Sequence, residues 1–164
     1  MRLAEEGQVL QSSVPYDSQG GAQAGDWISM KNYNHLTYII SRNAGTGTDN
    51  LVVTLDQSTD VANSLSDSQT LNITEWYEKT GTQTGVGTFT HHTQTAADGF
   101  TSDNPTTASL YVIEIDRAML DADDGFDCVS LAIADTGSAG AQLTSVIAVL
   151  SEARYPGGGL TAIA

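Results

Sequence analysis

The chain has 164 residues, a length typical of one domain, and only 16% of them are charged, which is below the usual quarter. Its formal net charge is −14, from 20 acidic and 6 basic residues, and the basic residues are scattered along the sequence. We therefore exclude nucleic acid and anionic membrane surfaces as expected partners, because both require clustered Lys and Arg. Much of the polar character comes instead from uncharged residues such as Thr and Asn, together with Gly, and this composition favours β structure with polar turns.

The first 25 residues form a polar lead that is rich in Gly and Gln. Pro15 and the pair Gly20-Gly21 argue against a helix in it. We predict an N-terminal arm over residues 1–25, either a frayed end or an ordered segment that docks on a neighbouring molecule. The apolar residues expected to anchor this arm on a capsid or other partner are Val9, Leu10, Val14 and Tyr16.

From residue 26 onward, short runs with β-type alternation are separated by turn signals, which predicts about eight strands. The last of these runs, 143–153, also matches a helical pattern, but its β-branched residues and the glycines before it favour a strand. Short helical turns are expected at 60–65 and 117–120. The predicted strands are 26–31, 35–41, 51–56, 69–79, 86–93, 110–116, 126–134 and 143–153.

Eight strands with long polar connections predict an all-β fold, a two-sheet β-sandwich that is jelly-roll-like and has extended N- and C-terminal segments. We place the sandwich domain at residues 26–156. The segment 157–164 combines a run of glycines with apolar residues and is predicted as a flexible C-terminal tail. It is either an unimportant end or a second docking arm, whose anchors would be Leu160 and Ile163.

The densest acidic cluster, 121–127, is the strongest candidate for a metal site. Its spacing differs from that of a calcium-binding loop, because the glycine comes one position early and no Glu closes the site. The Asp-Gly pair at 124–125, between two β runs, is instead typical of a hairpin turn. We therefore predict no metal and no cofactor, and leave an ion at this cluster as the open alternative.

The histidines and the cysteine form no catalytic pattern. His91 and His92 are adjacent, so on a strand their side chains point to opposite faces, and His35 stands alone in the sequence. Cys128, the only cysteine, lies in an apolar run and is expected to be a buried, unreactive thiol. Since no nucleophile motif or phosphate-binding loop is present either, we predict that the protein is not an enzyme.

A family resemblance is carried by the order and spacing of four strings over residues 25–155. They are Gly25-Asp-Trp-Ile-Ser-Met-Lys-Asn-Tyr-Asn-His35, Gln57-Ser-Thr-Asp-Val-Ala62, Gly125-Phe-Asp-Cys-Val129 and Leu150-Ser-Glu-Ala-Arg-Tyr155. In these strings the chain resembles small virion structural proteins of tailed bacteriophages, encoded beside the capsid genes. Similar proteins in that neighbourhood include capsid decoration, or cement, proteins built as β-sandwiches. The resemblance implies a virion part and supplies no site residues.

We accordingly expect a capsid decoration (cement) protein that binds the outer surface of the bacteriophage head and bridges capsid subunits. The expected partners are the major capsid protein and further copies of the chain, with a trimer favoured among decoration proteins. The expected place of synthesis is the host cytoplasm, since the chain starts without a signal-peptide pattern and has no apolar run of about 20 residues, the length that spans a membrane. Deleting residues 1–20 is expected to leave the fold intact and to abolish capsid binding.

Two alternatives stay open from the sequence. The first is a structural role at the head–tail junction or in the tail. The second is a carbohydrate-binding β-sandwich module, in which Trp27, Trp76 and Tyr77 would stack on sugar rings.

Overall fold

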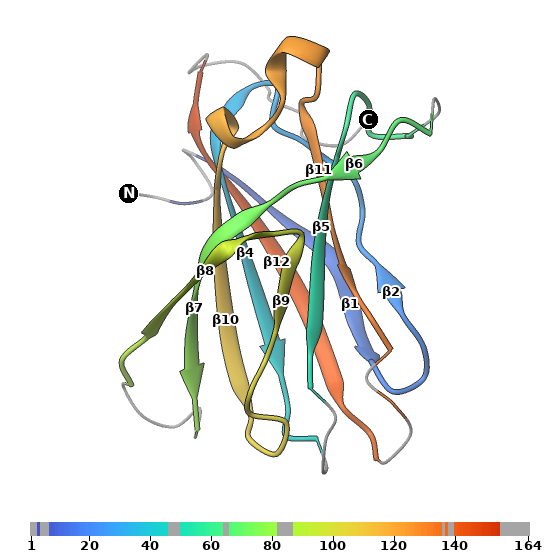
Figure 1. The fold of residues 1–164 in the computed structure, drawn as a ribbon, viewed down its shortest axis with the longest axis vertical. Helices are drawn as coiled ribbons and strands as arrows, with labels where there is room; N and C mark the ends of the chain where they lie inside the picture. Colours follow the sequence, from blue (N-terminus) through green and yellow to red (C-terminus); the bar gives the residue numbers. More distant parts are fainter. Residues whose placement is uncertain are drawn as a thin grey trace.

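The computed structural model describes residues 3, 7–45, 50–63, 66–81, 87–135, 137 and 140–154. These residues form two antiparallel β-sheets packed face to face (Figure 1). Among the described residues from 7 onward, helical structure is limited to two short 3-10 turns, η1 (Arg117–Met119) and η2 (Ala122–Asp124). The predicted all-β sandwich is confirmed.

The first sheet, called here the long sheet, has the strand order β1-β12-β4-β10-β7-β8. The second, the short sheet, has the order β2-β11-β5-β6, with β3 paired to β11 and β9 paired to β5. Successive segments of the chain cross repeatedly from one sheet to the other, so each sheet is built from strands that are distant in the sequence. The strands of the long sheet are β1 (Gln8–Asp17), β4 (Tyr33–Arg42), β7 (Ile73–Thr80), β8 (Thr90–Ala97), β10 (Ser109–Asp116) and β12 (Leu143–Ala153). Those of the short sheet are β2 (Gln23–Ala24), β3 (Ile28–Ser29), β5 (Val52–Ser58), β6 (Gln69–Thr70), β9 (Gly99–Thr101) and β11 (Cys128–Ile133).

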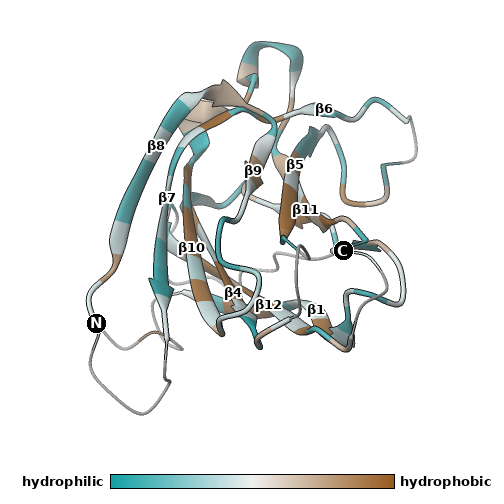
Figure 2. Cartoon of the chain, turned by 60° about the horizontal axis from the view of Figure 1, so that its bottom comes forward, coloured by the Kyte–Doolittle hydropathy of each residue, from teal (hydrophilic) through white to brown (hydrophobic). Residues whose placement is uncertain are grey.

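The core fills the space between the two sheets and follows from the alternation of apolar residues. On β4, Leu36, Tyr38 and Ile40 are fully buried, and Val53 and Leu55 of β5 face them from the short sheet. Burial of one such side chain stabilises the fold by roughly 1.5–3 kcal/mol, so the alternation decides which face of each strand turns inward. Figure 2 shows hydrophobic residues concentrated along β4, β10, β5 and β11, whereas much of β8 is hydrophilic.

The prediction of an N-terminal arm is wrong for residues 8–17. They form β1, the outermost strand of the long sheet, which pairs with β12 from Gln8 opposite Leu150 to Asp17 opposite Leu143. Two shifts of register interrupt the pairing, and Pro15 is accommodated because a strand at the edge of a sheet needs hydrogen bonds on one side only. The sandwich therefore begins well before residue 26.

Other boundaries differ from the sequence prediction in smaller ways. The predicted strand 26–31 is reduced to β3, and 69–79 divides into β6 and β7. The ambiguous run at 143–153 is a strand, as predicted, and 117–119 is a helical turn. The tail 157–164, with its proposed anchors Leu160 and Ile163, lies outside the described residues.

Candidate functional site

One row of side chains crosses the whole long sheet on the face that points away from the core. The strand registers align β1, β12, β4, β10, β7 and β8 along this row. Its four central members are large and apolar or aromatic, and Ile147 among them is 42% exposed. A continuous apolar strip is thus open on an outer sheet face. In spatial order, this outer row consists of Gln11, Ile147, Ile39, Val112, Tyr77 and His91.

Further exposed apolar side chains extend the strip toward the β1 edge. Val9 and Val14 of β1 are 52% and 62% exposed, and Leu143 of β12 is 54% exposed. Val9 lies opposite Val149 in the sheet, in the row next to the outer row. We call the outer row together with these flanking residues the binding face.

The structure separates the predicted arm anchors into two pairs. Val9 and Val14 are exposed and belong to the binding face, whereas Leu10 and Tyr16 pack against the core. Burial raises the pKa of Tyr16 to about 12, as expected for a phenol removed from water. Only two of the four predicted N-terminal anchors are therefore available to a partner. Removal of residues 1–20 would leave β12 paired on one side only, with β4, and would strip Leu10 and Tyr16 from the core.

Carboxylates and histidines border the outer row on one side. His35 of β4 bridges two acids of β10, with Nε2 at 2.5 Å from Glu114 Oε2 and Nδ1 at 2.8 Å from Asp116 Oδ1. Burial by itself lowers the pKa of His35, but the hydrogen bonds and charges of these two acids outweigh it and raise the pKa above its ordinary value. His35, alone in the sequence, thus belongs to a cross-strand cluster that sequence spacing could not reveal.

The two adjacent histidines lie on opposite faces of β8, as predicted. His91 faces outward, stacks on Tyr77 with ring centroids 4.9 Å apart, and lies 2.8 Å from Glu75 through Nε2. His92 faces inward, stacks on Trp76 with centroids 5.1 Å apart, and lies 3.1 Å from the buried Glu78.

The aromatic residues considered for sugar binding do not form one platform. Trp76 and Tyr77 are neighbours on β7 and point to opposite faces, so they cannot stack on one sugar together. Trp76 packs inward on Phe100, with ring centroids 4.6 Å apart, and Tyr77 belongs to the outer row. Trp27 lies in the connection between β2 and β3 of the other sheet.

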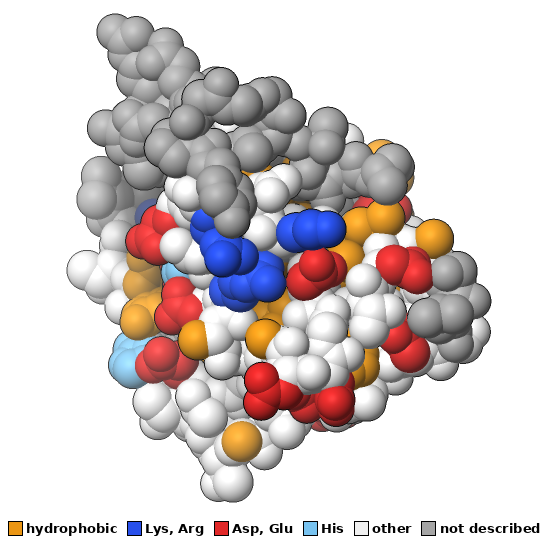
Figure 3. All heavy atoms as spheres, turned by 90° about the horizontal axis from the view of Figure 1, so that it is seen from above, with side chains coloured by type: hydrophobic (Ala, Val, Ile, Leu, Met, Phe, Trp, Pro, Cys, Tyr) orange, Lys and Arg blue, Asp and Glu red, His pale blue; other side chains and the backbone are white. Residues whose placement is uncertain are grey.

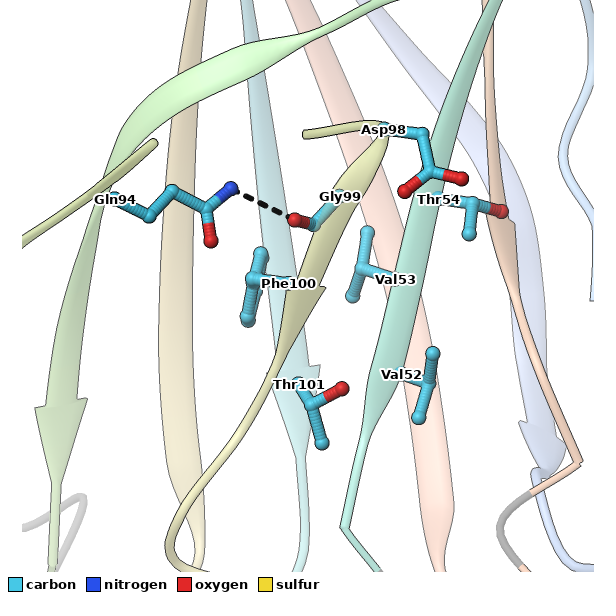
Figure 4. A pocket seen from close by; sticks show the side chains of 8 residues that line it. All are labelled: Val52, Val53, Thr54, Gln94, Asp98, Gly99, Phe100 and Thr101. Atoms are coloured by element: carbon cyan, nitrogen blue, oxygen red, sulfur yellow. Dashed lines mark hydrogen bonds between the residues drawn. The ribbon is translucent and has the colours of Figure 1, made fainter. Parts of the chain in front are cut away.

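A shallow pocket of about 240 Å³ lies where β8 meets the short sheet (Figure 4). Gln94 of β8 donates from Nε2 to the carbonyl oxygens of Gly99 at 2.8 Å and Ile73 at 3.2 Å. Both amide hydrogens of Gln94 are thereby used inside the protein, and the contact ties β9 to the long sheet. We interpret this pocket as a packed corner of the sandwich. Its lining residues are Val52, Val53, Thr54, Gln94, Asp98, Gly99, Phe100 and Thr101.

The acidic cluster at 121–127 forms η2 and a turn that ends at Gly125, whose φ of 86° is in the left-handed region favoured by glycine. Within the described ranges, no group of three or more His, Cys, Asp or Glu side chains is arranged to hold a metal ion. In the same part of the chain, no helix is long and apolar enough to cross a membrane.

Cys128 is buried, as predicted from its apolar surroundings. Burial, aided by the neighbouring Asp127, raises the pKa of its thiol to about 12. The thiol therefore stays protonated at neutral pH, and a protonated thiol is a poor nucleophile.

No protein-family model matches the chain, and no curated protein matches it either. The functional interpretation therefore depends on the geometry of the binding face and on the sequence resemblance described above.

Proposed function

We propose that this protein is a bacteriophage capsid decoration (cement) protein, which binds the outer surface of the head through its binding face and bridges capsid subunits. The strip of large apolar side chains across the long sheet is the observation that supports binding to another protein. The assignment to a virion comes from the resemblance of the four sequence strings. The expected partner is the major capsid protein.

An exposed strip of this kind favours association with another protein surface. Contiguous apolar area on an outer face marks interaction sites, since covering it removes apolar surface from water. Tyr77, which is partly exposed in the outer row, adds an aromatic residue of the type enriched at the centres of interfaces. The carboxylates of Glu75, Glu114 and Asp116 beside the strip favour a partner surface that carries basic side chains next to apolar ones.

The proposed mechanism differs from the one expected for an arm. An extended arm would add a strand to a sheet edge of the capsid protein, but β1 is already paired with β12 along one side. Docking through a sheet face requires no ordering of a free segment, so it avoids a backbone entropy cost of roughly 1–2 kcal/mol per ordered residue. A rigid face laid across the junction of two capsid subunits would oppose their separation under the pressure of packaged DNA.

Binding of purified variants to heads that lack the protein tests this proposal. Ile147→Asp places a charge in the middle of the strip, and we expect it to weaken co-sedimentation with heads at least about tenfold, which corresponds to about 1.4 kcal/mol. The matched control is Ala24→Asp, an exposed position on the outer face of the short sheet, which should bind as the unchanged protein does. Circular dichroism verifies that both variants are folded.

Two results would overturn the proposal. Equal head binding by Ile147→Asp and the unchanged protein would exclude the binding face. Cryo-electron microscopy density confined to the neck or tail of the virion would exclude decoration of the head and favour the junction or tail role instead.

A further inference from the structure

Three basic residues that are far apart in sequence meet at one end of the sandwich, around the turn between β3 and β4. Arg117 of η1 donates from Nη1 to the carbonyl oxygen of Met30 at 3.0 Å. Arg154 donates from Nη1 to the carbonyl oxygen of Lys31 at 3.3 Å, and its backbone nitrogen donates to the backbone carbonyl oxygen of Asn32 at 2.9 Å. We call Lys31, Arg117 and Arg154 the basic cluster. It gathers half of the 6 basic residues of a chain whose net charge is −14.

The basic cluster is open to solvent. Lys31 and Arg154 are exposed and Arg117 is half-buried. Within the described ranges, neither Lys31 nor Arg117 forms an ion pair with an acidic side chain. Their charges therefore remain available to an acidic group of another molecule.

A group of exposed carboxylates lies at the same end. Asp121, Asp123 and Asp124 belong to the η2 turn, which follows η1 directly, and we call them the acidic turn. The backbone nitrogen of Met30 donates to the backbone carbonyl oxygen of Asp127 at 2.7 Å, and Asp127 follows the acidic turn closely in the chain, so this bond ties the two segments together. Figure 3 views this end and shows Lys and Arg side chains grouped near its centre, with Asp and Glu side chains around them.

An exposed apolar side chain lies between the two charged groups along the chain. Met119, the last residue of η1, is 39% exposed and stands between Arg117 and the acidic turn. Methionine adapts its shape to a partner surface more readily than branched apolar residues do. This end of the sandwich thus presents positive, apolar and negative groups side by side.

Such a patch is complementary to itself. In a twofold contact the same patch is used by both molecules, and each residue pair occurs twice. A twofold axis near Met119 would place the basic cluster of each copy on the acidic turn of the other. A nucleic acid fits this end less well, since the carboxylates beside the cations repel a continuous polyanion.

We propose that two copies of this protein associate end to end through the basic cluster, Met119 and the acidic turn. This inference does not depend on the proposed capsid function. The contact is weak, because exposed ion pairs contribute little and the two copies repel each other through their net charge. It therefore forms at high local concentration, such as that of many copies held on one surface.

Sedimentation equilibrium of the purified full chain, at concentrations up to about 1 mM and low ionic strength, tests the proposal. The unchanged protein is expected to show a monomer–dimer equilibrium. Lys31→Glu and Asp123→Lys should each weaken it at least about tenfold, since each change creates two like-charge contacts in a twofold interface. An equimolar mixture of the two variants should restore association, because every reversed charge then meets an opposite charge.

The matched control is Lys79→Glu, which makes the same change in net charge on the long sheet, outside the proposed contact. Its dimer should be at least about tenfold tighter than that of Lys31→Glu. Thermal unfolding of each variant verifies that it is folded. The proposal would be overturned if the unchanged protein stayed monomeric throughout this concentration range. So would a mixture that associates no better than its components. Neither result bears on head binding, which is measured with a different partner.

Discussion

The outer faces of the two sheets differ although both cover the same core. The row of the short sheet that corresponds to the outer row runs across β2, β11, β5 and β9. Its residues are small or polar, whereas those at the centre of the outer row are large and apolar or aromatic. The two rows are Ala24, Ala132, Thr54 and Gly99 in the short sheet, and Ile147, Ile39, Val112 and Tyr77 in the long sheet.

This difference shows what the fold itself requires. An antiparallel sheet needs apolar residues on the face that covers the core, and its other face can be solvated. In the row compared here, the short sheet meets this requirement with Thr, Ala and Gly on its outer face. The large apolar residues of the long sheet therefore exceed what folding needs, and this excess is the reason to interpret them as a binding face.

The largest expected effect compares the two faces of a single strand. Ile40 of β4 is fully buried and Ile39 beside it is only half-buried. Ile40→Ala is expected to lower the free energy of unfolding by about 2–5 kcal/mol, since it leaves a cavity in the core. Ile39→Ala should lower it by about 1 kcal/mol, because less apolar surface is lost from a half-exposed site. Urea denaturation measures both, and equal losses would contradict the distinction between the inner and outer faces.

A smaller effect is expected from the close approach of β9 to β5 in the short sheet. A Cβ atom on Gly99 would lie 1.7 Å from the carbonyl oxygen of Val53, so that backbone must move to admit any side chain. Gly99→Ala is expected to lower the free energy of unfolding by about 1–3 kcal/mol, the range typical of overpacking.

Gly87→Ala is the control for this substitution. A Cβ atom there would meet only the flexible end of the Lys79 side chain, which can move aside. Thermal or urea unfolding compares the two variants. Equal stability of Gly99→Ala and the unchanged protein would contradict the close approach of β9 to the backbone of β5.

The smallest effect concerns the charged border of the long sheet. The pKa of His35 is raised in the folded protein. Its contribution to the free energy of unfolding is therefore complete below the unfolded pKa of about 6.5, and it is lost as the pH rises through the folded pKa. His35→Gln should therefore destabilise the protein more at acidic than at alkaline pH. The difference is expected to be about 1 kcal/mol or less, since the partners are partly exposed to water.

Unfolding free energies measured on both sides of neutrality check this prediction. The same substitution in an Asp116→Asn background supplies the control, because one of the two acids is then uncharged and the pH dependence should shrink. A destabilisation by His35→Gln that is independent of pH would rule out a contribution from the ion pairs.

Local alternation made much of the fold predictable. The strands β4, β5, β10, β11 and β12 lie close to their predicted positions, since period-two runs of apolar residues identify a face to bury. The burial of Cys128 and the opposed directions of His91 and His92 follow from the same local rule. β1 was missed because Pro15 and two irregularities of register break its alternation. Its place in the sheet depends on pairing with β12, at the other end of the chain.

The sequence by itself determined the fold class, because each strand shows in its own residues which side must be buried. Only the tertiary structure decided which outward-facing residues lie side by side. The outer row joins residues of six strands through their register, and the basic cluster joins Lys31, Arg117 and Arg154 through backbone contacts around one turn. In the sequence these basic residues are scattered. Registers and turn contacts are set by the packing of distant segments, so surfaces built from several strands cannot be read from any one of them.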